Sequence, residues 1–324
     1  MAKKFTKAKC EQAFLKICGY GPSGRGKTFT TLLQAEGLVR GTKKRIAYID
    51  TEHGTDFYAM DVKERQIHPK AFDFDAIHTR SVKDVWDAVL LLDPEEYGVI
   101  VIDSITHLWD AIQEAVKPEQ RNSSGGIPLN LWGAVKKPYK NLEKFLLECD
   151  FHVFVLGRQK DTFEDDDGQL RKTGVSLRSE KETEYEYNIT MRYDAKKGKD
   201  TANTTILAIV EKDRTGILAG RTFPNPNFET IKPVLKILNG TQAKFEDPSE
   251  VAEKDQELIN GITPQQEKKS EDKYADFKSQ LESAKTKQSL DDVATKVGKS
   301  RILIEGDKEA LRGVYKVELK RIKK

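Results

Sequence analysis

One stretch of the sequence, Gly21-Pro22-Ser23-Gly24-Arg25-Gly26-Lys27-Thr28, follows the pattern G-x-x-x-x-G-K-[ST]. Glycines at these positions let the backbone wrap tightly and turn successive N–H groups toward phosphate oxygens. In this pattern the Lys27 ammonium group reaches the β- and γ-phosphates, and the Thr28 hydroxyl group is a ligand for Mg²⁺. All eight residues are therefore predicted to bind a nucleoside triphosphate together with Mg²⁺.

The flanking sequence places this loop between a strand and a helix. Residues 14–18 are mostly apolar and predict a short buried strand that ends at the loop. Residues 29–39 predict the following helix, and Gly41 is a favourable helix terminator. The N-terminal end of that helix adds its positive dipole to the phosphate site. We therefore expect an α/β protein in which the loop joins a strand of the sheet to the first helix.

Composition limits the class of protein. The 324 residues provide room for one sizeable α/β domain and a smaller appendage. The net charge of +3 is too small to indicate nucleic-acid binding by itself. Cys10, Cys18 and Cys149 show no metal or disulfide spacing, which suits a reducing compartment. No apolar run approaches the roughly 20 residues of a membrane-spanning helix, so we expect a cytoplasmic protein with no membrane partner.

Two further predicted strands end in acidic side chains. An apolar run over residues 46–49 leads into Asp50-Thr51-Glu52, and a second run over residues 99–102 leads into Asp103. The carboxyl ends of parallel strands form the ligand-binding edge of an open α/β sheet. Asp103 is therefore expected to support Mg²⁺ opposite Thr28, and Glu52 to deprotonate the attacking water. For Glu52 the alternative is an ordinary loop carboxylate.

A third predicted strand, residues 151–156, ends at Gly157-Arg158-Gln159. A polar side chain at this position can contact the γ-phosphate and respond to its hydrolysis. Arg158 and Gln159 are both candidates, and the sequence does not decide between them. The long charged segment that follows contains a predicted hairpin tip at residues 164–168.

A pair of cations follows the next predicted hairpin. Residues 185–193 and 204–210 alternate like strands on either side of a Lys- and Gly-rich turn. Lys212 and Arg214 come directly after the second strand and project to the same side. Such a pair suits a phosphate, bound either by the same chain or by a neighbouring copy. The alternative is a basic turn without a ligand.

The domain organisation follows from composition and periodicity. We predict a core domain over residues 1–240, in which residues 1–13 form a basic arm, and a polar linker over residues 241–270. Apolar residues recur at helical spacing over residues 271–324, which predicts a small helical bundle for docking or DNA binding. Two helix boundaries are also predicted from single residues: Pro138 opens the main part of a helix, and Gly298 ends another.

Taken together, these motifs resemble a known family. Ile49-Asp50-Thr51-Glu52-His53 is similar to the stretch of RecA-type recombinases that carries their catalytic glutamate, and Val101-Ile102-Asp103-Ser104 is similar to their Walker B strand. Lys212-Asp213-Arg214 resembles their Lys-x-Lys element, which reaches across a subunit interface to a neighbour's ATP. The chain more closely resembles phage-encoded RecA-like P-loop ATPases of the AAA family, including single-strand annealing recombinases, over about residues 10–235.

The resemblance implies a RecA-like core with a mostly parallel sheet flanked by helices, followed by the small helical bundle. It implies an ATPase with ATP and Mg²⁺ as cofactors, in which Lys27, Glu52 and Asp103 act in hydrolysis. Lys212 and Arg214 are expected to act in trans, so the resemblance implies a homo-oligomer with shared ATP sites. It also implies single-stranded DNA and a single-strand DNA-binding protein as partners in phage recombination or annealing, in the bacterial host cytoplasm.

The chain also departs from the family pattern. Gly157-Arg158-Gln159 does not clearly reproduce the glutamine switch of RecA, and the DNA loops, by analogy residues 118–130 and 160–182, do not match in sequence. Three other functions therefore stay open. They are an ATPase that loads or remodels a replication or recombination partner, a small-molecule kinase, and a nucleotide-gated binding module with negligible turnover.

Overall fold

The computed structural model describes residues 7, 13–65, 67–166, 169–196, 204–238, 252, 255–256, 271–300, 303 and 305–322. The chain divides into two compact units, residues 1–244 and 245–324. The predicted basic arm over residues 1–13 and the predicted linker over residues 241–270 lie almost entirely outside the described residues.

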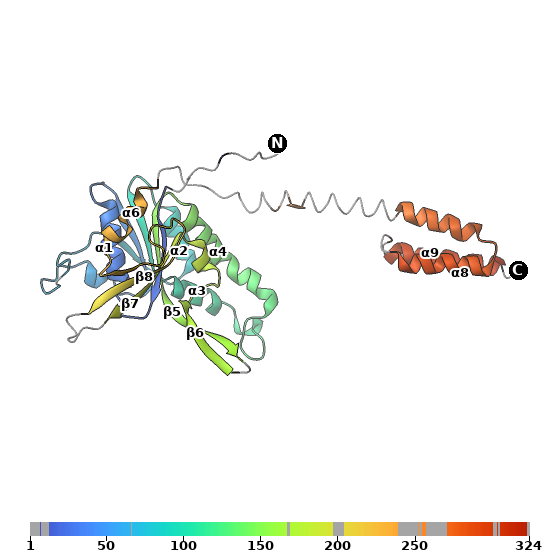
Figure 1. The fold of residues 1–324 in the computed structure, drawn as a ribbon, viewed down its shortest axis with the longest axis horizontal. Helices are drawn as coiled ribbons and strands as arrows, with labels where there is room; N and C mark the ends of the chain where they lie inside the picture. Colours follow the sequence, from blue (N-terminus) through green and yellow to red (C-terminus); the bar gives the residue numbers. More distant parts are fainter. Residues whose placement is uncertain are drawn as a thin grey trace. The chain divides into compact units, whose positions relative to one another are not determined.

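A largely parallel sheet forms the centre of the first unit (Figure 1). Its strands are β1 (Lys16–Gly21), β2 (Arg45–Asp50), β3 (Asp75–His78), β4 (Tyr97–Asp103), β5 (His152–Asp166), β6 (Gln169–Leu177), β7 (Ile189–Lys196), β8 (Thr205–Asp213) and β9 (Thr222–Pro224). The strand order is β3-β2-β4-β5-β1-β7-β8-β9, and β6 pairs with β5 outside this path. The strands from β3 to β7 in this order are parallel, whereas β8 and β9 are antiparallel additions. This is the RecA-like α/β core that the sequence predicted.

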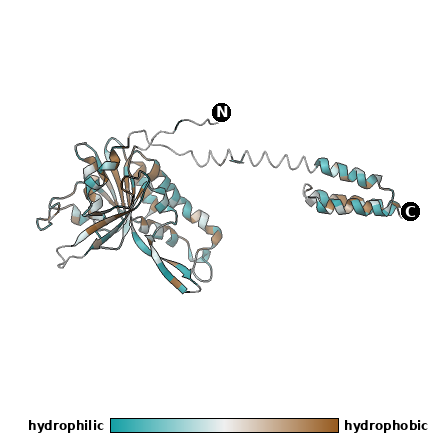
Figure 2. Ribbon diagram, viewed as in Figure 1, coloured by the Kyte–Doolittle hydropathy of each residue, from teal (hydrophilic) through white to brown (hydrophobic). Residues whose placement is uncertain are grey.

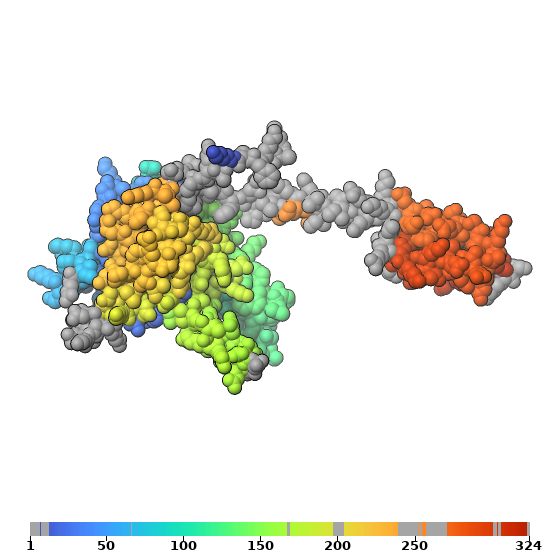
Figure 3. Space-filling model, viewed as in Figure 1, coloured from blue at the N-terminus to red at the C-terminus, as the bar shows by residue number. Residues whose placement is uncertain are grey.

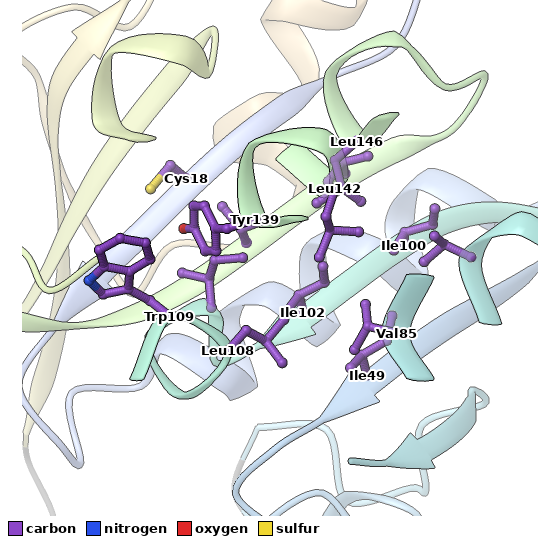
Figure 4. Packing of buried hydrophobic residues seen from close by; sticks show 14 of the residues in the cluster. Cys18, Ile49, Val85, Ile100, Ile102, Leu108, Trp109, Tyr139, Leu142 and Leu146 are labelled. Carbon is purple, nitrogen blue, oxygen red and sulfur yellow. The ribbon is translucent and has the colours of Figure 1, made fainter. Parts of the chain in front are cut away.

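Helices cover both faces of this sheet (Figure 1). On one face lie α1 (Lys27–Val39) and α6 (Phe228–Leu235), and on the other lie α2 (Val82–Leu90), α3 (Ile105–Glu114) and α4 (Trp132–Glu148). In the central strands β4 and β5, residues 99–102 and 153–156 form uninterrupted apolar runs, because both faces of the sheet are covered (Figure 2). In β4, for example, Val101 packs toward α1, while its neighbours Ile100 and Ile102 pack toward α2, α3 and α4 (Figure 4).

Several local predictions need correction. Residues 185–188 are not strand, because α5 (Thr183–Glu186) forms a short helical turn before β7 begins at Ile189. The strand predicted over residues 151–156 continues as β5 to Asp166 and pairs with β6 in a hairpin, although the tip at residues 167–168 lies outside the described residues. Pro138 lies inside α4 instead of opening it, because the helix already begins at Trp132. A proline has no N–H, so the carbonyl group of Ala134 receives no helical hydrogen bond from residue 138.

The second unit is a helical bundle, as predicted. A helix over residues 271–283 packs with α8 (Lys287–Lys299) and α9 (Glu305–Ile322) around one apolar cluster. Its most buried members are Leu281, Leu290 and Leu311. The hydroxyl group of Thr286 caps α8 by accepting from the Ser289 N–H group. Gly298 does not end this helix, which runs one residue further to Lys299.

The contact between α1 and α6 depends on one glycine. A Cβ atom added at Gly37 would lie 2.2 Å from the Phe228 ring. We expect Gly37→Ala to lower the free energy of unfolding by about 1–3 kcal/mol, because the ring must move out of a packed interface. Urea denaturation measures this. Gly133→Ala is the control, because Gly133 lies on an exposed part of α4 with no neighbour within 4 Å; an equal loss in both variants would contradict the explanation.

A partly buried histidine should make the stability of the first unit depend on pH. The Leu15 N–H group donates to His152 Nδ1 at 2.9 Å, and burial lowers the pKa of His152 to about 4. The unfolded chain takes up this proton near pH 6.5, so the neutral ring stabilises the fold above that pH, and the stabilisation is lost as pH falls toward 4. We expect a loss of about 2 kcal/mol in the free energy of unfolding between pH 7.5 and 5.

His152→Asn tests this, because an asparagine side chain can still accept from the Leu15 N–H group but does not titrate. Denaturation curves at both pH values should show a smaller decrease for the variant than for the wild type. Equal decreases would show that other groups cause the pH dependence.

Candidate nucleotide-binding site

The carboxyl ends of β1, β2, β4 and β5 surround a cavity of about 670 Å³. Every residue of the loop from Gly21 to Thr28 lines it, and so do Glu52, Asp103, Arg158 and Gln159. The structure therefore brings together all of the predicted site residues except Lys212 and Arg214.

The loop has the backbone that a phosphate site needs. Gly24 and Gly26 have φ angles of 71° and 75°, in the left-handed region that favours glycine. A Cβ atom at Gly26 would also lie 2.9 Å from the Ile206 side chain, so no other residue fits there without displacement. Helix α1 begins at Lys27, which lines the cavity. The N–H groups of the first helical turn have no partner within the helix, so they are available to an anion in the cavity.

The Lys27 side chain folds back over this loop. Its Nζ atom donates to the carbonyl oxygens of Gly21 at 3.1 Å and Pro22 at 2.9 Å. Burial lowers the pKa of Lys27, an effect that the nearby carboxylates of Asp103 and Glu52 oppose. The ammonium group is thus held at the cavity by neutral carbonyl acceptors. A phosphate oxygen is a charged and therefore stronger acceptor, and it can take their place.

A buried carboxylate joins the loop to two strands. Asp103 Oδ2 accepts from the Thr28 hydroxyl group at 2.6 Å and from the Tyr48 hydroxyl group at 2.9 Å. Burial raises the pKa of Asp103, and both hydrogen bonds oppose this rise. Mg²⁺ prefers hard oxygen ligands, and the adjacent oxygens of Thr28 and Asp103 fit that preference. Tyr48 was not predicted, because in an apolar strand it is indistinguishable from a core residue.

The loop that carries Glu52 is held by Asp50, another residue that the sequence did not single out. Asp50 Oδ1 accepts from the N–H groups of Glu52 and His53, both at 2.8 Å. Asp50 Oδ2 accepts from the N–H group of Thr55 at 3.0 Å and from its hydroxyl group at 2.5 Å. Burial alone would raise the pKa of Asp50, but these hydrogen bonds lower it. In the sequence, the only signal for such a turn is an aspartate followed by a short run of polar residues, whose N–H groups the carboxylate can accept from.

Glu52 itself forms an ion pair across the cavity. Its Oε1 atom accepts from Arg158 Nε at 3.1 Å and Nη2 at 2.9 Å. His107 Nε2 lies 3.8 Å from the same oxygen, and burial lowers the pKa of His107. Glu52, the predicted base, and Arg158, one of the two predicted γ-phosphate sensors, therefore contact each other directly. Gln159, the other predicted sensor, lines the same cavity.

Lys212 and Arg214 lie elsewhere on the first unit. Both donate to the carbonyl oxygen of Tyr185, Arg214 at 2.7 Å, and Lys212 also donates to that of Glu184 at 3.4 Å. Their side chains project to the same side, as expected, but neither lines the cavity of its own chain. A role in the site of a neighbouring copy stays a prediction.

A family match agrees with this nucleotide-binding site. Residues 13–215 match the family model described as AAA domain. Among solved structures, the KaiC-like protein PH0186 from Pyrococcus horikoshii OT3 is similar, with 14% identity and a TM-score of 0.39 over 66% of this chain and 85% of that chain. No curated protein matches the sequence. None of the helices within the described residues is long and apolar enough to cross a membrane. Because the family match covers more than half of the chain, the protein belongs to the AAA domain family, as a P-loop ATPase.

Proposed function

We propose that the protein hydrolyses ATP with Mg²⁺, and that single-stranded DNA stimulates hydrolysis by assembling copies of the chain during phage DNA recombination or annealing. The observation that carries the ATPase part is the contact between Thr28 and Asp103 beside Lys27, with Glu52 across the same cavity. A phosphate cradle, two metal-binding oxygens and a base for water are what hydrolysis of a phosphoanhydride requires.

The residues of the cavity have separate tasks in this proposal. The loop amides and Lys27 bind the phosphates, and Thr28 and Asp103 hold the metal ion, which when bound neutralises charge on the β- and γ-phosphate oxygens. Glu52 accepts the proton of the attacking water. Arg158 forms an ion pair with Glu52 in this structure. A γ-phosphate in the cavity would compete with Glu52 for the guanidinium group of Arg158. We propose that Arg158 moves from Glu52 to the phosphate, which frees the base.

Assembly completes the site in this proposal. Within the described residues, the side chains of Lys212 and Arg214 donate only to backbone carbonyl oxygens, which are neutral acceptors. A phosphate of a neighbouring copy is a stronger partner for two cations. In comparable enzymes an arginine supplied in trans raises kcat by roughly 10³–10⁵-fold, so assembly would control hydrolysis. Support for DNA as the assembling ligand comes from the motif resemblance to recombinases.

A second candidate is an ATPase that loads or remodels a partner, such as a single-strand DNA-binding protein. The second unit favours it, because this bundle has its own buried cluster and needs no residue of the ATPase core for it. A separately packed module of this kind suits docking to another protein. The two candidates differ in whether DNA or the partner protein stimulates hydrolysis.

Steady-state hydrolysis by the purified full chain, with and without single-stranded DNA, tests the proposal. We expect DNA to stimulate the wild type. Glu52→Gln should lower kcat by about 10²–10⁴-fold, as expected for loss of a general base, while Mg²⁺–ATP still binds. Arg214→Ala should lower the stimulated rate by about 10³-fold or more, whereas Arg221→Ala, which removes another exposed arginine, should not.

Mixing the two inactive variants gives a sharper result. If sites are shared, a mixture of Glu52→Gln and Arg214→Ala chains contains some sites with an intact Glu52 and an intact trans Arg214, so part of the activity returns. DNA-independent hydrolysis that survives Arg214→Ala would instead mean that the site is complete within one chain. The partner-remodelling function would then be the better one.

The contacts of Asp50 predict a loss of rate without a loss of binding. Asp50→Asn removes an acceptor from the turn that positions Glu52, and a displacement of about 1 Å can cost 10²-fold in rate. We expect kcat to fall about 10–100-fold while the Kd for ATP changes less than about threefold. Asp73→Asn, at an exposed position, is the control. A weaker Kd with unchanged kcat would contradict the positioning role.

A further inference from the structure

Besides Arg158, the carboxylate of Glu52 has a second neighbour, His107. The Nε2 atom of His107 lies 3.8 Å from Glu52 Oε1, the same oxygen that accepts from Arg158 Nη2 at 2.9 Å. No hydrogen bond reaches the other oxygen, Oε2, from any residue that the structure describes. Both neighbours therefore face one carboxylate oxygen, and the second oxygen is available to a water molecule.

The contacts of Thr51 decide which ring nitrogen of His107 carries the proton. The Ser104 N–H group donates to Thr51 Oγ1 at 2.7 Å, which leaves the proton of the Thr51 hydroxyl group for another acceptor. His107 Nδ1 lies 2.8 Å from this hydroxyl oxygen, whereas the Ser104 carbonyl oxygen lies 3.4 Å away. The hydroxyl group thus donates to Nδ1, and the proton of the neutral ring lies on Nε2. In the opposite tautomer the lone pair of Nε2 would face the carboxylate of Glu52, which repels it.

The surroundings of His107 keep its ring neutral. His107 lies in the first turn of α3, where the positive end of the helix dipole disfavours a second ring proton. Its side chain is only 11% exposed. Burial lowers the pKa of His107, and the charges of Arg158 and Arg80 lower it further, although the Glu52 carboxylate opposes the shift. At pH 7.5 His107 is therefore a neutral donor.

The two neighbours of this carboxylate differ in how firmly they are held. His107 precedes Leu108, which is fully buried in the core (Figure 4), and its ring contacts Thr51, whose carbonyl oxygen accepts from Arg80 at 2.9 Å. Arg158 is 50% exposed. Past Arg158, β5 pairs only with β6, in the hairpin that stands out from the first unit (Figures 1 and 3). Arg158 is thus the movable partner, and His107 is the fixed one.

We propose that His107 is a positioning residue for hydrolysis, which holds Glu52 Oε1 through its Nε2–H group once Arg158 has moved to the γ-phosphate. The separation of 3.8 Å must shorten by about 1 Å to become a hydrogen bond, and the Glu52 side chain, which is 39% exposed, has room to rotate. A neutral donor stabilises an ionised carboxylate less than an arginine does, so the exchange also makes Glu52 a better acceptor for the proton of water. The inference rests on the proposed function, because it requires Glu52 to be the base.

Nitrogen-15 NMR of the histidine rings in the full chain tests the contact without any hydrolysis. The chain contains five histidines, and the signals of His107 are those that disappear in His107→Gln. We expect the ring proton on Nε2 at pH 7.5, and a shift of this signal when Mg²⁺ and a non-hydrolysable ATP analogue are added. A ring proton on Nδ1 would overturn the proposal, since Nε2 could not then donate to Glu52. A signal that stays unchanged with the analogue bound would also contradict it.

Two substitutions separate the donor from the rest of the side chain. His107→Gln places an amide N–H group close to the position of Nε2, whereas the shorter side chain in His107→Asn reaches Thr51 but not Glu52. We expect His107→Asn to lower kcat by about tenfold or more and His107→Gln to stay within about threefold of the wild type. The Kd for Mg²⁺–ATP should change less than about threefold in both. Equal losses of kcat in two variants that both fold, as urea denaturation shows, would count against the donor.

A double variant shows whether His107 acts through Glu52. In a Glu52→Gln background, His107→Asn should change kcat by less than about twofold, because the base that it positions is already absent. A further loss of about tenfold would mean that His107 acts elsewhere, and the proposal would fail.

Failure of the proposed function has a different signature. A wild type that does not hydrolyse ATP, or a Glu52→Gln variant as fast as the wild type, would overturn the proposed function whichever ring nitrogen of His107 carries the proton. Hydrolysis that depends on Glu52 but is unchanged in His107→Asn would overturn only the role of His107.

Discussion

The buried carboxylate of Asp103 is the group on which the site depends. A carboxylate inside a sheet costs several kcal/mol unless hydrogen bonds and opposite charges compensate for its lost hydration. Thr28 and Tyr48 donate to the same oxygen, and Lys27 lies close enough to oppose the rise in its pKa. Because Thr28 belongs to α1, Tyr48 to β2 and Asp103 to β4, satisfying one charge fixes three elements relative to each other. The oxygens that we propose as metal ligands are thus already positioned by contacts within the protein.

Parallel register extends this arrangement across the sheet. Asp50 lies opposite Asp103 in the pairing of β2 with β4, and Gly21 lies opposite Arg158 in the pairing of β1 with β5. Since Asp103 lies opposite Leu156, two residues before Arg158, all four strands reach the cavity within two residues of one level, and each contributes a residue at the same edge. Only β5 continues far past that edge, into the hairpin with β6. The strand that carries Arg158 is consequently the one that joins the cavity to the hairpin.

The sequence was informative where the determinants are local. The loop from Gly21 to Thr28 could be predicted because its conformation depends on its own glycines. Strand β4 could be predicted because a short run of β-branched apolar residues is typical of a strand covered on both faces. Pro138 was misplaced because tertiary packing of α4 tolerates a proline that local preference would put at a helix start. Tyr48 and Asp50 could not be assigned to the site, since their partners are hydroxyl and N–H groups that only the folded chain brings to them.

Ion pairs in this chain differ in how readily they can change partners. Asp103 is 6% exposed, so breaking its contacts leaves an uncompensated buried charge. The pair of Arg158 and Glu52 is different, because these side chains are 50% and 39% exposed and such pairs contribute only about 0–1 kcal/mol. Exchange of Arg158 between Glu52 and a phosphate therefore costs little, whereas the Asp103 contacts stay in place. In the proposed mechanism, the buried Asp103 contacts keep the site in place, and the exposed pair of Arg158 and Glu52 changes partners when the ligand binds.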